Sequence, residues 1–184
     1  MKASVYIATS LDGFIARKDG KLDWLPGANG EESNPEADQN EDYGFNAFME
    51  SIDVLVMGRN TYDMVQSFGK WPYGEKRVIV MSSNLVRIPK KLTETVSSKN
   101  CSPAELVQEL AESGAKHLYI DGGKTIQGFL NAGLINEIII TRIPVLIGTG
   151  IPLFGPLDQD QKLRHIETRS FPNGLVQSRY EVVR

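Results

Sequence analysis

Residues 54–61 read VLVMGRNT, a continuously apolar run that stops at Gly58 and passes into polar residues. An unbroken apolar run of this length is typical of a strand that is covered on both faces, as in a parallel sheet. Asn60 is suited to cap a helix, and Val65 and Phe68 supply apolar side chains to that helix. The stretch therefore predicts a buried strand that leads through a glycine turn into a helix.

The same order of strand, polar turn and helix recurs further along the chain. Residues 77–81 and 117–120 are further runs of strand length. Ser102 and Glu105 have the spacing of a capping box, and Pro103 occupies the first helical position, so a helix begins there. This alternation of strands and helices indicates an α/β protein with a mostly parallel sheet.

The last part of the chain follows a different pattern. Residues 163–171 and 175–183 look like two strands, and Pro172, Asn173 and Gly174 lie between them. An Asn-Gly pair between two strands is a strong signal for a β-hairpin. We therefore expect residues 1–184 to form a single domain whose sheet ends in antiparallel strands.

Composition excludes several classes of protein. The 184 residues contain 20 Lys and Arg against 23 Asp and Glu, a net charge of −3, so no chain-wide basic field for nucleic acid exists. One cysteine and two histidines are too few for a structural Cys/His zinc site. No apolar run approaches the roughly 20 residues of a membrane span. Because the N-terminus also lacks a signal-peptide pattern, we expect a cytoplasmic protein without a metal site or membrane contact.

The turn after residues 54–57 carries the residue types of a phosphate site. Gly58 lets the backbone approach a ligand closely, and the following helix presents free N–H groups to an anion. Arg59 can form paired hydrogen bonds with a phosphate, and the Thr61 hydroxyl can donate another. Taken alone, these residues are explained more simply by an ordinary strand-to-helix turn with an exposed arginine.

Two further strand ends carry similar residues. Gly122 and Gly123 precede a helix and can form a backbone nest for phosphate, although a tight turn is about as good an explanation. Ser82 and Ser83 follow the strand at 77–81, where serines are common for structural reasons. Ligands of parallel sheets bind at the carboxyl ends of the strands. The coincidence of three such turns at one edge predicts an extended polyanionic ligand, such as a dinucleotide.

Four motifs in order cover nearly the whole chain. Residues 7–16, IATSLDGFIA, resemble the S-L-D-G-x-I-A opening of the reductase domain of bacterial riboflavin-biosynthesis proteins, the RibD C-terminal domain. Residues 56–62, VMGRNTY, resemble the V-M-G-R-x-T-[WY] stretch of dihydrofolate reductases. Residues 121–130, DGGKTIQGFL, match a glycine turn found in both, and residues 134–150 resemble a later segment of the riboflavin reductase domain.

This resemblance implies a dihydrofolate reductase-like, three-layer α/β fold with a mostly parallel sheet of about eight strands and a C-terminal antiparallel hairpin. It also implies NADPH as cofactor. Arg59 would hold the 2′-phosphate together with Ser82 or Ser83, and Ala8 would lie near the nicotinamide. The residues expected to hold the pyrophosphate are Thr61, Gly122, Gly123, Lys124 and Thr125.

The implied reaction is hydride transfer to a small heterocyclic substrate, as in 5-amino-6-(5-phosphoribosylamino)uracil reductase. Asp12 is the candidate for positioning that substrate, although an Asp-Gly turn explains it equally well. A dihydrofolate or pterin reductase is one alternative, and it predicts that Asp42 or Glu41 points into the pocket. A nucleotide-binding protein without catalysis is another.

Two further expectations concern the surroundings of this site. Residues 26–43 contain six acidic residues and no Lys or Arg, so they form either a lid or a plain surface loop. The family resemblance also implies a homodimer, to which an apolar edge around residues 138–147 would contribute.

Overall fold

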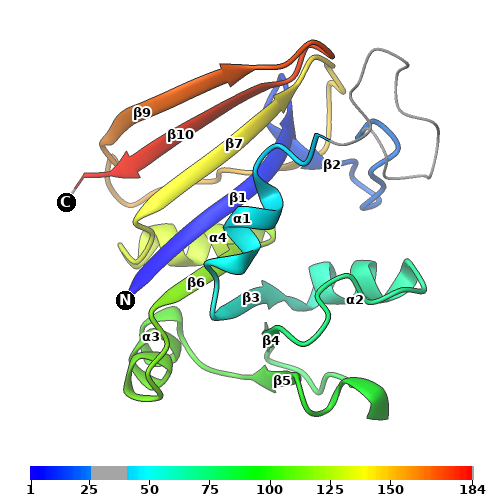
Figure 1. Cartoon of the computed structure of the whole chain (residues 1–184), viewed down its shortest axis with the longest axis vertical. Helices are drawn as coiled ribbons and strands as arrows, with labels where there is room; N and C mark the ends of the chain where they lie inside the picture. The colour runs from blue at the N-terminus through cyan, green and yellow to red at the C-terminus, as the bar shows by residue number, and fades with distance from the viewer. Residues whose placement is uncertain (26–40, 184) are drawn as a thin grey trace.

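The predicted strand at residues 54–57 lies inside an eight-stranded sheet, in a computed structural model that describes residues 1–25 and 41–183 (Figure 1). Six neighbouring strands run parallel, and the hairpin β9–β10 adds antiparallel strands at one side. In spatial order the strands are β5 (Val96–Lys99), β4 (Arg77–Met81), β3 (Val54–Gly58), β6 (His117–Asp121), β1 (Lys2–Ser10), β7 (Glu137–Ile143), β10 (Val176–Val182) and β9 (Leu163–Ser170). The predicted α/β class, parallel sheet and hairpin are confirmed.

Helices cover both faces of the sheet, which makes three layers (Figure 1). α1 (Phe45–Glu50) and α2 (Arg59–Ser67) pack on one face, and α3 (Pro103–Glu112) and α4 (Gly123–Asn131) pack on the other. A short helix, η1 (Lys90–Leu92), follows β4, and β2 (Phe14–Ala16) pairs with β8 (Ile151–Pro152) in a small separate sheet. The predicted capping box at the start of α3 is present.

β3 shows why the apolar run forms a central strand. Its four apolar residues are at most 2% exposed. Val54 and Val56 join the core under α3 and α4, whereas Leu55 and Met57 join the core under α1 and α2. Side chains of a strand alternate between its faces, so a strand covered on both sides must be apolar at every position.

Strand order overturns one expectation about dimerisation. β7 lies between β1 and β10, so residues 138–143 are inside the sheet and form no edge. The prediction of an apolar edge there was wrong, because the hairpin pairs along β7 and carries the free edge outward to β9. The homodimer itself stays a prediction.

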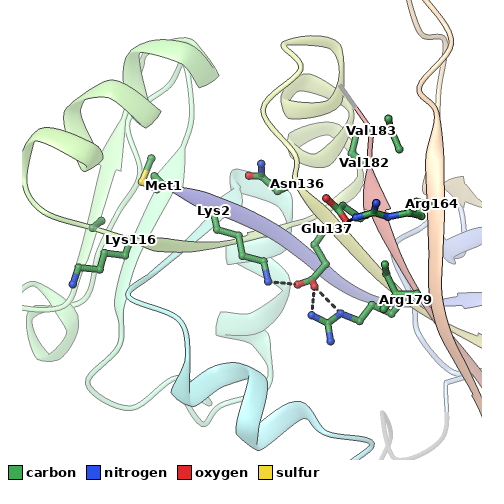
Figure 2. A pocket seen from close by; sticks show the side chains of 12 residues that line it. Met1, Lys2, Lys116, Asn136, Glu137, Arg164, Arg179, Val182 and Val183 are labelled. Carbon is green, nitrogen blue, oxygen red and sulfur yellow. Dashed lines mark hydrogen bonds and ion pairs between the residues drawn. The ribbon is translucent and has the colours of Figure 1, made fainter.

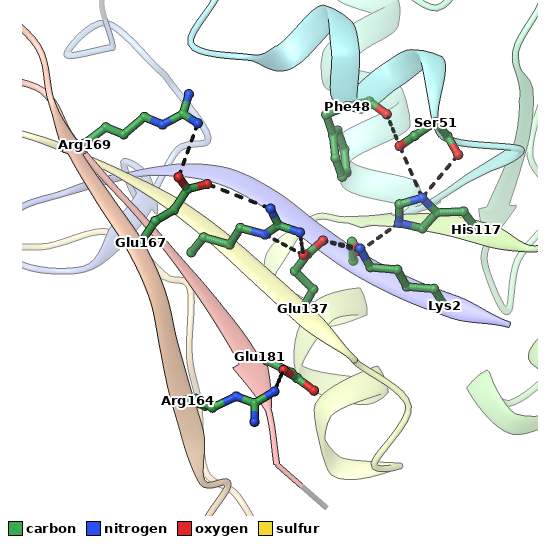
Figure 3. Close-up of polar contacts among 11 residues, drawn as sticks. Lys2, Phe48, Ser51, His117, Glu137, Arg164, Glu167, Arg169 and Glu181 are labelled. Carbon is green, nitrogen blue, oxygen red and sulfur yellow. Dashed lines mark hydrogen bonds and ion pairs between the residues drawn. The ribbon is translucent and has the colours of Figure 1, made fainter.

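A buried carboxylate ties the hairpin to the parallel part of the sheet (Figure 3). Glu137 on β7 accepts hydrogen bonds from Lys2 Nζ at 2.7 Å, from Arg179 Nε at 2.6 Å and from the Ser4 hydroxyl at 3.0 Å. Burial raises the pKa of Glu137, but the hydrogen bonds from Lys2 and Arg179 outweigh burial and lower the pKa below its ordinary value. The ionised Glu137 carboxylate therefore stabilises the fold fully at pH values above the ordinary pKa of glutamate. This contribution to stability is lost as the pH falls through the folded pKa.

A Glu137→Gln variant should therefore be about 2 kcal/mol less stable at pH 7, since it leaves two cations without their buried partner. The difference should shrink as the pH falls from the ordinary pKa of 4.5 through the lower folded pKa, because the folded wild-type carboxyl is then protonated as well. Urea unfolding at pH 7 and at a series of pH values below 4.5 measures both effects. The control is Glu181→Gln, which removes the exposed pair with Arg164. Equal losses in the two variants would contradict the role of burial.

Candidate active site

The carboxyl ends of the central strands meet at one edge of the sheet. The register pairs Met57 with Asp121 and Gly58 with Met81, so β3, β4 and β6 end side by side. Ser10, at the end of β1, pairs with Ile143 of β7 at the same edge. The predicted turns therefore start from one rim, as the pattern of parallel strands requires.

Two of these turns are in direct contact. A Cβ atom built on Gly58 would lie 2.8 Å from Thr125 Oγ1, and one built on Gly122 would lie 2.3 Å from Thr61 Oγ1. Gly122 also has a φ of +86°, which side chains other than glycine rarely adopt. Both glycines are required by this close approach, and the two threonine hydroxyls lie between the turns.

Gly123 packs closely against the small sheet formed by β2 and β8. A Cβ atom there would lie 3.0 Å from Ile15 Cδ1 and 3.3 Å from the carbonyl oxygen of Pro152, so the small sheet packs against the start of α4. A side chain at Gly123 would crowd these neighbours, and its absence leaves the N–H groups of the turn unobstructed. Lys124 follows with an exposed side chain.

Helices α2 and α4 both begin at this contact, and the N–H groups of their first turns have no side-chain partner within either helix. Neither has a side-chain cap, and neither has an acidic residue in its first turn. By contrast, α3 begins elsewhere with Ser102 and Glu105 satisfying its first N–H groups. The starts of α2 and α4 thus bring uncapped N–H donors and the positive ends of two helix dipoles to the same place. This combination favours the binding of an anion.

Arg59, Ser82 and Ser83 lie at the loop that follows β4. The Arg59 guanidinium donates from Nε to Asp63 Oδ2 at 2.7 Å and from Nη1 to the carbonyl oxygen of Leu85 at 2.8 Å. The Ser82 hydroxyl donates to the carbonyl oxygen of Asn84 at 2.9 Å and is thus engaged in its own turn. Ser83 is exposed. The structure therefore brings Arg59 to the loop that follows β4.

Asp12 is engaged by the backbone of another loop. Its carboxylate accepts hydrogen bonds from the Ser10 hydroxyl at 2.6 Å and from Gly148 N at 2.7 Å. These bonds, the one from Ser10 foremost, lower the pKa of Asp12, so the group is ionised at neutral pH. Asp12 thus holds the 147–148 loop against the end of β1 and is no proton donor at neutral pH. Substrate positioning by Asp12 stays a prediction.

Asp121 is a candidate that the sequence reasoning did not assign. It ends β6 directly before Gly122, whose N–H it accepts at 2.8 Å, and it is half-buried. Burial raises its pKa to about 6. Perturbed carboxyls at such strand ends are candidates for acid or base roles. The signal available in the sequence was an acidic residue immediately before a Gly-Gly turn.

A comparison with known families shows to which family this chain belongs. The family model of the RibD C-terminal domain matches residues 2–177. The chain belongs to the RibD C-terminal domain family. This confirms the resemblance to that family, and the dihydrofolate reductase-like fold implied by it is confirmed by the sheet order and the solved structures described next.

Relatives of this RibD C-terminal domain include single-domain and longer proteins. It is 34% identical to the uncharacterized protein YwjB of Bacillus subtilis (strain 168). That alignment spans 173 residues and covers 92% of each chain. It is 26% identical to the riboflavin biosynthesis protein RibD of Corynebacterium ammoniagenes, of which the match covers 43%. The first of these two relatives therefore has the same extent as this chain, and the second is more than twice as long as the matched part.

Solved structures give the same fold. A putative riboflavin biosynthesis protein from Shewanella sp. PV-4 shares 44% identity with a TM-score of 0.90 over 100% of both chains. A deaminase and 5-amino-6-(5-phosphoribosylamino)uracil reductase from Thermotoga maritima shares 14% identity with a TM-score of 0.71, over 99% of this chain and 56% of that one. At 14% identity the second likeness supports the fold alone.

The acidic residues that a pterin reductase would need are engaged elsewhere in this RibD C-terminal domain. Asp42 accepts hydrogen bonds from Gly44 N at 2.9 Å and from Asn46 N at 3.0 Å, at the start of α1. Glu41 accepts one from Tyr43 N at 2.8 Å. Their contacts are thus with their own turn, which gives no support to the pterin alternative. Residues 26–40 of the predicted lid or loop lie outside the described residues.

An aromatic cluster lies next to Asp121. The Tyr73 hydroxyl is close enough for the Asp121 charge to add to the burial that raises its pKa. Trp71 packs edge-on against Tyr73 and Tyr62, with ring centres 5.1 and 6.1 Å apart. Its buried indole N–H has no hydrogen-bond partner within the described part of the chain. The cluster thus packs against the core under α1 and α2 and includes one buried donor without a partner among the described residues.

A hollow of the surface lies at the opposite edge of the sheet from the glycine turns (Figure 2). It measures about 980 Å³ and is lined by residues at the amino ends of β1 and β7, such as Lys2 and Glu137, and by residues from the second half of β10, such as Arg179. Its main charges are already paired with one another. Within residues 1–25 and 41–183, no group of three or more His, Cys, Asp or Glu could hold a metal ion. No helix in those ranges has the length and apolar character to cross a membrane.

Proposed function

We propose that this RibD C-terminal domain is an NADPH-dependent reductase that reduces a small heterocyclic substrate. The observation that carries the proposal is the contact between two uncapped helix starts at Gly58 and Gly122, with Arg59 beside them. NADPH carries a pyrophosphate and a separate 2′-phosphate, and this arrangement offers anion donors for both. Family membership supports the reductase class.

The bound cofactor would supply the hydride, and the residues of this chain would supply binding, orientation and a proton. The N–H of Gly123 would hold the pyrophosphate at the glycine turn, with Gly122, Thr61, Lys124 and Thr125 around it. Ala8, half-buried near the end of β1, would lie near the nicotinamide. Asp121, whose pKa of about 6 lets it carry a proton close to neutral pH, would serve as the general acid.

The substrate class follows from the aromatic cluster and the carboxyl group beside it. A flat ring with N–H or amino groups would pack against Trp71 and Tyr73 and donate hydrogen bonds to Asp121. 5-Amino-6-(5-phosphoribosylamino)uracil is such a ring, and the relative from Corynebacterium ammoniagenes is a riboflavin biosynthesis protein. Turnover assays with this pyrimidine and with dihydrofolate separate the reductase from the pterin alternative. Binding of NADPH without turnover of either would favour the non-catalytic alternative.

Arg59→Ala should weaken NADPH binding by about tenfold or more, because charge-assisted hydrogen bonds to the 2′-phosphate are lost. NADH lacks that phosphate, so its dissociation constant should change little. Titration of both nucleotides, followed by nicotinamide fluorescence, measures the difference directly. Equal losses for the two nucleotides would contradict the role of Arg59.

A further inference from the structure

Arg59 is already engaged by an acidic neighbour on its own helix. Its Nε donates to Asp63 Oδ2 at 2.7 Å, one turn further along α2, and Nη1 donates to the carbonyl oxygen of Leu85. A guanidinium has five N–H donors, and phosphates bind it best through two adjacent ones. Asp63 occupies the Nε donor, so the pair formed by Nε and Nη2 cannot bind a phosphate while this contact persists.

The stability of α2 does not account for this pair. Arg59 is the first residue of the helix, where a positive charge meets the positive end of the helix dipole. The side chains are 38% and 52% exposed, so the ion pair itself contributes little to folding. A basic residue placed before the acidic one is also the weaker order for such a pair. The contact between Arg59 and Asp63 therefore affects which ligand Arg59 can bind.

We propose that Asp63 sets the nucleotide selectivity of the site by competing for Arg59, an inference that rests on the proposed function. A 2′-phosphate must displace the Asp63 carboxylate from Nε before it can use that donor. A free ribose 2′-hydroxyl does not need Nε, and a carboxylate is the group that accepts hydrogen bonds from it in many dinucleotide sites. Asp63 thus lowers the preference for NADPH over NADH that Arg59 alone would produce.

Asp63→Asn tests this directly, because asparagine keeps the size of the side chain and removes the charge. The dissociation constant for NADPH should fall by about two- to fivefold, and that for NADH should stay the same or rise. In an Arg59→Ala background the same substitution should leave NADPH binding nearly unchanged, since no guanidinium remains to be released. Both constants are measured by fluorescence titration at one fixed ionic strength.

Glu112→Gln is the matched control for net charge. It also removes one negative charge, from the last residue of α3, which leads to the amino end of β6. It should leave both nucleotide constants unchanged. Unchanged or weaker NADPH binding in Asp63→Asn would overturn the inference, as would a gain that persists in full without Arg59. If the wild-type protein bound neither nucleotide, the proposed function would fail, and this inference would fail with it.

Discussion

Asp121→Asn should make the protein more stable at pH 8 than the wild type. Burial raises the pKa of Asp121 in the folded state from 3.8 to about 6. The folded protein therefore holds this proton more tightly than the unfolded chain does, so stability is full below pH 3.8 and falls as the pH rises through 6. At pH 8 the buried charge costs up to about 3 kcal/mol, which asparagine avoids while still accepting the N–H of Gly122.

Thermal unfolding between pH 4 and pH 8 measures this effect. The variant should gain up to roughly 6–12 °C at pH 8 and almost nothing at pH 4. Asp53→Asn is the control with the opposite sign. Asp53 accepts hydrogen bonds from the backbone N–H groups of Lys116 and His117 at 2.7 and 2.9 Å, and these lower its pKa. That variant should lose stability at pH 8. A loss in Asp121→Asn as well would show that the Asp121 charge is not destabilising.

The same Asp121 substitution should abolish most turnover. A general acid contributes about 10²- to 10⁴-fold to a rate, and asparagine cannot deliver a proton. A residue whose removal stabilises the fold and lowers the activity is present for the chemistry and not for the packing. Nucleotide binding should persist in this variant, which separates loss of the acid from loss of the cofactor site.

Gly122→Ala should damage both the fold and the nucleotide site. The new Cβ would lie 2.3 Å from Thr61 Oγ1, in a backbone with a φ of +86°. The backbone of Gly122, with φ +86° and ψ 136°, is one that essentially only glycine adopts, and it costs an alanine about 1–3 kcal/mol. Displacing Thr61 adds about 1–3 kcal/mol. Urea unfolding should show the sum, and NADPH titration should show loss of binding, because the two turns can no longer touch.

Gly114→Ala measures the cost of a side chain at a positive φ without any clash. Gly114 has a φ of +87°, and no atom lies within 4 Å of its added Cβ. Only the backbone cost should appear, with NADPH binding intact. Adding Thr61→Ala to Gly122→Ala should restore part of the stability, since it removes the obstructing hydroxyl. Equal losses for the two single alanine variants would contradict the close contact between the turns.

Much of the fold follows from short-range patterns in the sequence. The apolar run at 54–57 predicted a strand covered on both faces, and its residues do join both cores. The capping box at Ser102 and Glu105 predicted the start of α3, and the Asn-Gly pair predicted the hairpin. These signals work because periodicity, capping and turn chemistry depend on residues within a few positions of one another.

The sequence also predicted which turns meet at one edge, because all parallel strands end there. It could not predict the partners of individual side chains. Asp12 is bound by a loop 135 residues away, and Asp121 becomes a perturbed acid only through burial by distant segments.

By itself, then, the sequence determined the α/β class, the central strands β3, β4 and β6, the C-terminal hairpin and the glycine turns of this RibD C-terminal domain, but not the short strands β2, β5 and β8. Only the tertiary structure decided that β7 is interior, that Gly122 touches Thr61, and that Arg59 is shared between Asp63 and the loop at Leu85. The physical reason is distance along the chain. Local conformation is set by neighbouring residues, whereas strand order, burial and side-chain pairing depend on segments that meet only when the chain folds.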